Sequence, residues 1–220
     1  MEPADLANLL NEYLDGACKE VFRFGGTVNQ FTGDAIYAMF NAPREQPDHA
    51  RRALNCAIAI DNFSQAFVKE KAAAGVEFGK TRIGVHTALA SVGNFGSRDR
   101  FEYKALGDAV NTASRLEGLN KYFGTHLLIS GGCAQYCTDQ PMRPLGHVVV
   151  KGREHPIEVM EPLSDERDKS ELMARYRAAF EALDRGEPGA KGMFEALHRD
   201  FPDDGPTAFH LERINAGQIT

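Results

Sequence analysis

The order of helical and extended segments constrains the fold of this chain most strongly. Residues 3–22 carry apolar side chains at helical spacing, residues 27–31 and 35–40 read as strands, and residues 49–74 read as a second helix. Two strands, a third helix that Gly124 closes, a short apolar strand and a hairpin follow. Paired strands separated by single helices predict an α+β fold with the helices mainly on one face of the sheet.

A second helical pattern begins after Pro162. Its apolar residues recur at helical spacing, and the stretch "GEPGAKG" interrupts them, so two or three short helices are expected. The members of the first stripe are Leu172, Tyr176, Phe180 and Leu183. We therefore predict a main domain over residues 1–163 and a helical C-terminal extension over residues 164–220. The extension can pack on its own domain, which is the favoured interpretation, or on a partner helix.

Composition narrows the class of protein. The 220 residues carry a net charge of −6, which argues against a broad nucleic-acid or anionic-membrane surface. The sequence shows neither an apolar run of about 20 residues nor a signal peptide. The spacing of its four cysteines suits neither a zinc ribbon nor a redox pair, so reduced thiols in a cytoplasmic protein are expected.

Asp34 is the acidic residue of the stretch "FGGTVNQFTGDAIYAMF" and stands at the expected hairpin turn. A carboxylate held at a hairpin tip suits Mg²⁺, which prefers oxygen ligands and is usually bound by one or two carboxylates together with substrate phosphates. The alternative is that Gly33-Asp34 is only a turn sequence, because both residue types favour turns.

Asn111 and Arg115 are four residues apart on the third predicted helix, which places both side chains on one face. The alternative for Arg115 is a surface ion pair with Glu117. Lys151 falls at the turn of the last predicted hairpin, where a solvated lysine is the alternative to a binding role.

Three stretches of the sequence together resemble the class III nucleotidyl cyclases, which make cyclic AMP or cyclic GMP. They are "GGTVNQFTGDAIYAMF", "GNFGSRDRFEYKALGDAVNTASRLEGLNK" and "RPLGHVVVKGREHPIEVMEPL", and they occur in the family's order. The resemblance implies a ferredoxin-like (βαββαβ-type) sandwich and an adenylate cyclase domain that converts ATP to 3′,5′-cyclic AMP and pyrophosphate in intracellular signalling.

The same resemblance assigns roles to individual residues. Asp34 matches one of two aspartates that hold two Mg²⁺ or Mn²⁺ ions, and Asn111 matches a residue that orients the ribose. Arg115 matches a residue that stabilises the transition state, and Lys151 matches a lysine that contacts phosphate. The family's sites lie between two domains, so a homodimer with shared sites is expected.

The sequence departs from the family in two places. The strand that carries the first metal aspartate precedes the first helix in the family and has no counterpart here, so we expect neighbouring strands to lose a pairing partner. With one aspartate, we expect little or no cyclase activity from this chain alone. The alternative function is a catalytically inactive cyclase-like dimerisation or regulatory module.

The base-reading positions also differ from the family. Gln30 and Lys104 stand where the family has its base-reading residues, and their hydrogen-bonding groups fit adenine or guanine. We favour ATP and keep guanylate cyclase as an alternative. His86 is expected to be a packed or hydrogen-bonded residue, and Asp108 to cap or complement a helix N-terminus.

Overall fold

A computed structural model describes residues 2–149 and 156–218 of the chain. The first part contains α1 (Pro3–Arg23), β1 (Thr27–Thr32), β2 (Ala35–Met39), α2 (His49–Ala73), β3 (Ile83–Val85), β4 (Ser91–Gly96) and β5 (Phe101–Leu106). The second part contains α3 (Asp108–Phe123), β6 (Leu127–Ser130), α4 (Gly131–Ala134), β7 (Met142–Val148) and β8 (Ile157–Pro162). The helical extension consists of α5 (Asp165–Asp168), α6 (Glu171–Asp184), α7 (Ala190–Asp200) and α8 (Gly205–Asn215).

The α+β architecture predicted from the sequence is confirmed. The described part of the extension contains four helices where two or three were expected, because the single-turn helix α5 precedes α6, and two further elements were missed. One is the single-turn helix α4, and the other is β5, which pairs with β4 as an antiparallel hairpin. The segment "FEYKAL" of β5 alternates apolar and polar residues, which is a signal for a strand. An aspartate just before a helix favours an N-cap, and Asp48 does occupy the N-cap position of α2, although its side chain makes no capping hydrogen bond. The helix begins at His49 as expected, but the carboxylate of Asp48 pairs with Arg52 at 2.7 Å instead of binding the helix N-terminus.

The strands form three separate sheets. The largest has the order β3–β6–β8–β7, with β3 and β6 parallel and the other pairs antiparallel. β1 pairs only with β2, and β4 pairs only with β5. Within the described residues β2 and β3 therefore each have one hydrogen-bonded neighbour.

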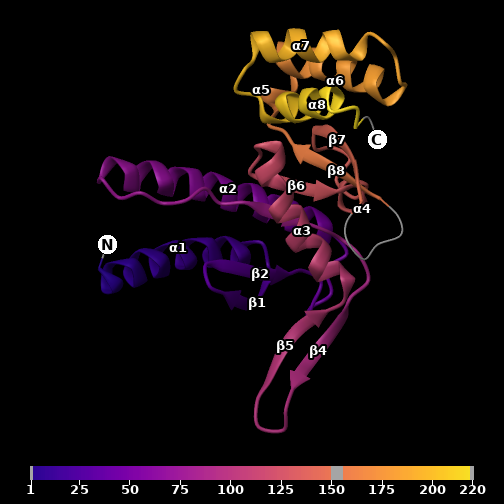
Figure 1. Cartoon of the computed structure of the whole chain (residues 1–220). Coiled ribbons are helices and arrows are strands. Elements are labelled where there is room, and N and C mark those ends of the chain that lie inside the picture. Colours follow the sequence, from indigo (N-terminus) through magenta and orange to yellow (C-terminus); the bar gives the residue numbers. More distant parts are fainter. Residues whose placement is uncertain (1, 150–155, 219–220) are drawn as a thin grey trace.

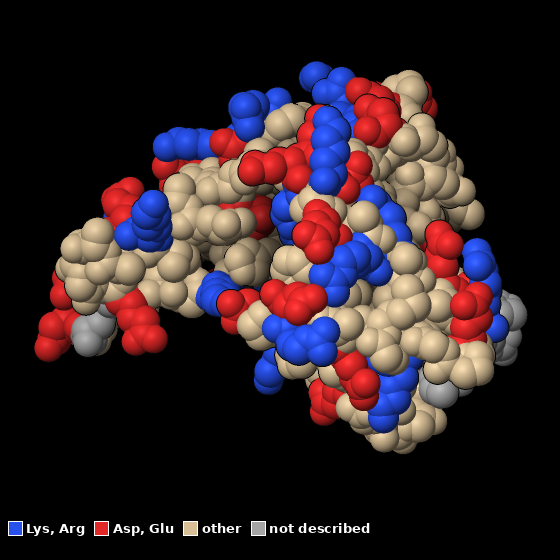
Figure 2. Space-filling model, turned by 90° about the horizontal axis from the view of Figure 1, so that it is seen from above, with Lys and Arg blue, Asp and Glu red and all other residues tan. Residues whose placement is uncertain are grey.

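Figure 1 shows how these sheets lie relative to the helices. α1 and α2 pack against each other, and α1 also contacts β1. The β4–β5 hairpin projects at one end of the molecule, and helices α5–α8 form a layer at the opposite end, beyond β7 and β8. On the face seen in Figure 2, basic and acidic residues are interspersed and no large area carries a single sign of charge.

The hydrophobic core lies in the second half of the chain. One buried cluster joins α3 and β6–β8 to α6 and α7, and it includes Leu116, Leu128, Tyr176 and Phe194. A smaller cluster joins α2 to β6 and α4. In contrast, β1 to β5 contain no fully buried residue. None of the described helices combines the length and apolar character that a membrane crossing requires.

A buried arginine attaches the helical extension to the sheet. Arg143 of β7 is 0% exposed, and its guanidinium donates to both carboxylate oxygens of Asp204, the N-cap of α8. It also lies 3.7 Å from the centre of the Tyr176 ring and 3.5 Å from the carboxylate of Glu161. Burial alone would raise the pKa of Asp204, but the hydrogen bonds and charge of Arg143 outweigh it and hold that pKa below its usual value. The extension thus packs on its own domain.

Candidate functional site

Asp34 follows Gly33 at the tip of the β1–β2 hairpin. Gly33 has a φ of +63°, a left-handed conformation that favours glycine, and Asp34 is exposed. No hydrogen bond or ion pair to the Asp34 carboxylate occurs in the described residues. The phenol of Tyr13 has a raised pKa, chiefly because of burial and with further contributions from the charges of Asp34 and Asp61. Because Asp34 is exposed and its carboxylate has no bonding partner in the described residues, the carboxylate is available as a ligand.

Asp34 does not belong to a cluster of metal-ligating side chains in the part of the chain that the structure describes. No group of three or more His, Cys, Asp or Glu residues that could hold a metal ion occurs over residues 2–149 and 156–218. Asp34 thus fits a Mg²⁺ or Mn²⁺ ion as one ligand only, and the remaining oxygens would have to come from phosphates or from a second chain.

Asn111 and Arg115 lie one turn apart on α3, as predicted. Asn111 is exposed, and the Arg115 side chain is 33% exposed. Nη1 of Arg115 makes no hydrogen bond, and its distance to the Asp108 carboxylate is 3.9 Å, the limit of an ion pair. The expected alternative partner, Glu117, instead pairs with Arg82 at 3.0 Å. Nη1 itself is buried, so the donors that a ligand can reach belong to the exposed third of the Arg115 side chain.

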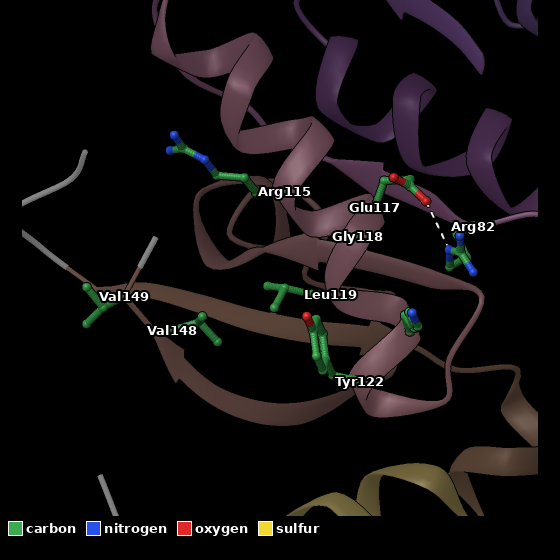
Figure 3. A pocket seen from close by; sticks show the side chains of 9 residues that line it. Arg82, Arg115, Glu117, Gly118, Leu119, Tyr122, Val148 and Val149 are labelled. Atoms are coloured by element: carbon green, nitrogen blue, oxygen red, sulfur yellow. Dashed lines mark hydrogen bonds and ion pairs between the residues drawn. The ribbon is translucent and has the colours of Figure 1, made fainter. Parts of the chain in front are cut away.

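A pocket of about 450 Å³ lies between α3 and the end of β7 (Figure 3). Arg115 extends from α3 at one end of this pocket, Tyr122 lies toward the other end, and Leu119 and Val148 lie between them. Three basic side chains and a single acidic one line it, so the pocket favours an anionic ligand. The charged residues are Arg82, Arg115, Lys121 and Glu117. Val149 also lines the pocket, and Lys151, two residues further on, lies outside the described residues.

The predicted base-reading residues lie on two neighbouring strands, because β1 approaches β5. Gln30 of β1 is exposed, and its side-chain amide donates to the hydroxyl of Thr32 at 3.3 Å. Lys104 of β5 is 26% exposed and pairs with Glu102 at 3.5 Å. Both side chains can therefore exchange these weak contacts for contacts to a ligand.

The two halves of the candidate site are not bonded to each other within the described part of one chain. Over the residues that the structure describes, no hydrogen bond or ion pair connects Asp34 with Asn111 or Arg115. A single chain thus presents an exposed carboxylate on one hairpin and an amide with a guanidinium on α3, as separate surfaces.

The remaining residues considered from the sequence make contacts, or are buried, in ways that fit a structural role. His86 shares a hydrogen bond of 2.7 Å with the hydroxyl of Ser130, as expected for a hydrogen-bonded histidine. Asp108 lies in the first turn of α3, where its charge complements the helix dipole, while Gly107 takes the N-cap position. All four cysteines are free thiols. Burial raises the pKa of Cys56 to about 12 and that of Cys133 to about 11, so these two thiols are unreactive.

Comparisons with known proteins agree with this arrangement. A model of the family described as "Adenylate and Guanylate cyclase catalytic domain" matches residues 2–160. The chain is 41% identical over 160 residues to "Adenylate cyclase 1" of Rhizobium meliloti (strain 1021), a match that covers 72% of this chain and 24% of that protein. The chain therefore spans about a quarter of the length of that relative.

Two solved structures share the fold. The adenylyl cyclase CyaB from P. aeruginosa superposes with a TM-score of 0.69 at 30% identity, covering 77% of this chain and 88% of that one. The guanylyl cyclase Cya2 superposes with a TM-score of 0.65 at 27% identity, covering 74% and 82% of the two chains.

Proposed function

We propose that this chain, which belongs to the family of adenylate and guanylate cyclase catalytic domains, contributes a domain that converts ATP to 3′,5′-cyclic AMP and pyrophosphate. The observation that carries this proposal is the pair Asn111 and Arg115, one turn apart on α3, with Arg115 lining a cation-rich pocket. In this reaction the ribose 3′-oxygen loses its proton and bonds to the α-phosphorus, while the bond from that phosphorus to the pyrophosphate oxygen breaks.

The proposed roles follow from the chemistry of each side chain. Arg115 donates to the oxygens of the α-phosphoryl group, where negative charge builds up in the transition state. It suits this role because a guanidinium is always charged and offers several donors in one plane. Asn111 holds the ribose, and Lys151 contacts the phosphates. Asp34 would hold Mg²⁺ or Mn²⁺, which when bound neutralises phosphate charge.

A homodimer would complete the site. The accessible carboxylate of Asp34 and the donors of Arg115 are not bonded to each other within the described part of one chain, so a second copy would bring its Asp34 to the Arg115 of the first. Twofold symmetry would give two equivalent sites. We further propose that residues 1–163 form the catalytic domain, that residues 164–220 extend it, and that the protein acts in the cytoplasm. Four free thiols support the last point.

Turnover by the 220-residue chain tests the proposal. With ATP and Mg²⁺ or Mn²⁺ we expect only slow formation of cyclic AMP, because the sequence supplies only one of the two aspartates that hold the ions in the family. Asp34→Ala and Arg115→Ala should each abolish that activity, whereas Ser114→Ala, an exposed neighbour on α3, should preserve it. Fast turnover by the chain would contradict the single-carboxylate site.

Mixing variants tests whether two chains share the site. Asp34→Ala and Arg115→Ala chains, inactive alone, should together recover about one quarter of the wild-type rate. Half of the dimers are then mixed, and each mixed dimer keeps one intact site of two. If mixing restores nothing while both variants dimerise, the shared-site arrangement is wrong.

Two alternatives remain testable in the same assays. Gln30 and Lys104 can also satisfy guanine, so faster turnover of GTP than of ATP would assign the domain as a guanylate cyclase. The loosely surrounded Asp34 favours the second alternative, a catalytically inactive dimerisation or regulatory module. That function would be supported if the chain dimerises but binds neither nucleotide.

A further inference from the structure

The β4–β5 hairpin has two unlike faces. Its register places Gly93 opposite Lys104 and Phe95 opposite Glu102, so these four side-chain positions share one face. All four are half-buried, and we call them the inner face. The other face is open to solvent and carries the exposed apolar residues Val92, Phe101 and Tyr103. The polar pair on the inner face is only partly sheltered, because the side chain of Lys104 is 26% exposed and that of Glu102 is 41% exposed.

The inner face carries an aromatic ring beside a glycine. Because Gly93 has no side chain, nothing on β4 stands directly opposite Lys104. A Cβ atom added at Gly93 would meet only the ring of Phe95, at 3.8 Å, which is an ordinary van der Waals distance. The Phe95 ring therefore lies beside Gly93, and among the described residues other than its chain neighbours no other atom comes within 4 Å of the position that a side chain on Gly93 would start from. Aromatic side chains in such positions stack on nucleic-acid bases.

The polar pair on the same face matches the edge of a purine. The ammonium of Lys104 lies 3.5 Å from a carboxylate oxygen of Glu102, so a donor and an acceptor lie side by side. Adenine offers an amino group beside the acceptor N1, and guanine offers two N–H donors beside the acceptor O6. Either purine can accept from Lys104 and donate to Glu102.

From this geometry we infer that Phe95 and Glu102 are base-recognition residues that act together with Lys104. Phe95 stacks on the purine of the bound nucleotide above Gly93, and Glu102 accepts a hydrogen bond from the edge of the base. This inference rests on the proposed function, because it requires a purine nucleotide at the site. Gln30, on the neighbouring strand β1, then faces the base from another side.

Calorimetric titration of the whole chain with ATP, GTP and inorganic triphosphate tests this inference. Phe95→Ala should weaken binding of the preferred nucleotide about tenfold, since base stacking on an aromatic side chain contributes roughly 1–3 kcal/mol. Phe95→Tyr should stay within about twofold of wild type, because it retains the ring. Glu102→Gln should weaken nucleotide binding severalfold. Triphosphate, which lacks a base, should bind equally to all of these variants.

Tyr103→Ala is the matched control, because it removes an aromatic ring from the same strand but from the opposite face. It should bind ATP and GTP like wild type. Phe95→Leu, which retains apolar bulk, replaces Phe95→Ala if the alanine variant does not fold. If the Phe95 variants bind nucleotides as tightly as wild type, the inference is wrong and the proposed function stands. If wild-type chain binds neither nucleotide nor triphosphate, the proposed function itself fails.

Discussion

Two regions of this molecule differ in how completely their strands are enclosed. The core region, formed by α3, β6–β8 and α6–α8, contains the side chains of the main buried cluster. The strand region, formed by β1, β2, β4 and β5, has no fully buried residue. Yet the strand region carries Asp34, Gln30 and Lys104, three of the proposed site residues. The proposed ligand-binding residues thus lie on strands that contain no fully buried residue, and the buried side chains that stabilise the fold lie in the core region.

Two arginines, one in the core region and one at the proposed site, differ in the same way in their burial and in their partners. In the core region, Arg143 is fully buried and contacts two carboxylates and an aromatic ring. At the proposed site, Arg115 is part-exposed and has one long ion pair of 3.9 Å. Burying an arginine is costly unless carboxylates pair with it, and Arg143 has two such partners even though its Nε–H finds none in the described residues. An arginine that serves a ligand must instead keep accessible donors. The two residues thus differ in partners because they differ in role.

The largest expected effect compares two phenylalanines. Phe194 on α7 is 0% exposed and Phe101 on β5 is 65% exposed. Phe194→Ala should lower the free energy of unfolding by about 3–5 kcal/mol, because it leaves a cavity in the core. Phe101→Ala should change it by less than about 0.5 kcal/mol. Urea unfolding measures both.

Repeating the Phe101 measurement at high and low protein concentration sharpens the comparison. If the exposed face of β5 is covered by a second copy, the loss in stability should appear only at high concentration. A large loss from Phe101→Ala at every concentration would mean that the strand region is as well packed as the core region.

The next effect concerns the attachment of the helical extension. Asp204→Ala should lower the free energy of unfolding by roughly 3 kcal/mol, because it leaves Arg143 buried without its bidentate partner. The loss is at the low end of such values, since Glu161 remains 3.5 Å from the same guanidinium. Asp203→Ala, an exposed neighbour, is the control and should be neutral. Equal stability of the two variants would show that α8 is attached by apolar packing alone.

The sequence predicts local features of this fold well. Gly124 ends α3 in the left-handed conformation, with φ of +68°, because a glycine after a helical run favours that geometry. The β1–β2 hairpin and the placement of Asn111 and Arg115 on one helix follow from equally local spacing. These features need only neighbouring residues, so one sequence is enough to predict them.

Features that depend on distant residues could not be predicted in this way. Arg143 and Asp204 are separated by 61 positions, and nothing near either one indicates a partner. Asp48 precedes a helix and fits the pattern of an N-cap, but Arg52 competes for its carboxylate. The pairing of Phe95 with Glu102 could not be predicted because β5 itself was missed. Its apolar and polar residues alternate as in a strand, but the apolar Phe101 and Tyr103 are exposed and not buried.

A smaller, pH-dependent effect is expected at His210 of α8. This imidazole is surrounded by the rings of Phe180, Phe194 and Phe209, and burial lowers its pKa to about 4. The charges of Arg143 and Arg213 lower it further, and that of Asp204 opposes them. A lowered histidine pKa means that the unfolded chain binds the proton more tightly. Stability therefore falls as the pH drops from 6.5 towards 4.

The loss from His210 should amount to about 2 kcal/mol at pH 5 relative to pH 7. His210→Phe should remove this part of the pH dependence while preserving the aromatic packing. Unfolding curves at several pH values between 4 and 7 measure the difference between the variant and wild type. If both lose stability equally over this range, His210 is not the group responsible.

The smallest effect is a difference in thiol labelling, and it locates the boundary between the two regions. Cys18 on α1 is part-exposed, whereas Cys56 on α2 and Cys133 on α4 are buried. In native protein at pH 8 we expect Cys18 to react first with an alkylating reagent, and Cys133 to react only when the core region opens. Mass spectrometry over time gives the rate for each thiol.

Cys56 decides the comparison, because α2 contacts both α1 and β6. If Cys56 reacts as slowly as Cys133, α2 opens with the core region, and the weakly enclosed part of the chain consists of the strands alone. If it reacts nearly as fast as Cys18, then α1, α2 and the strands open together as one less stable unit.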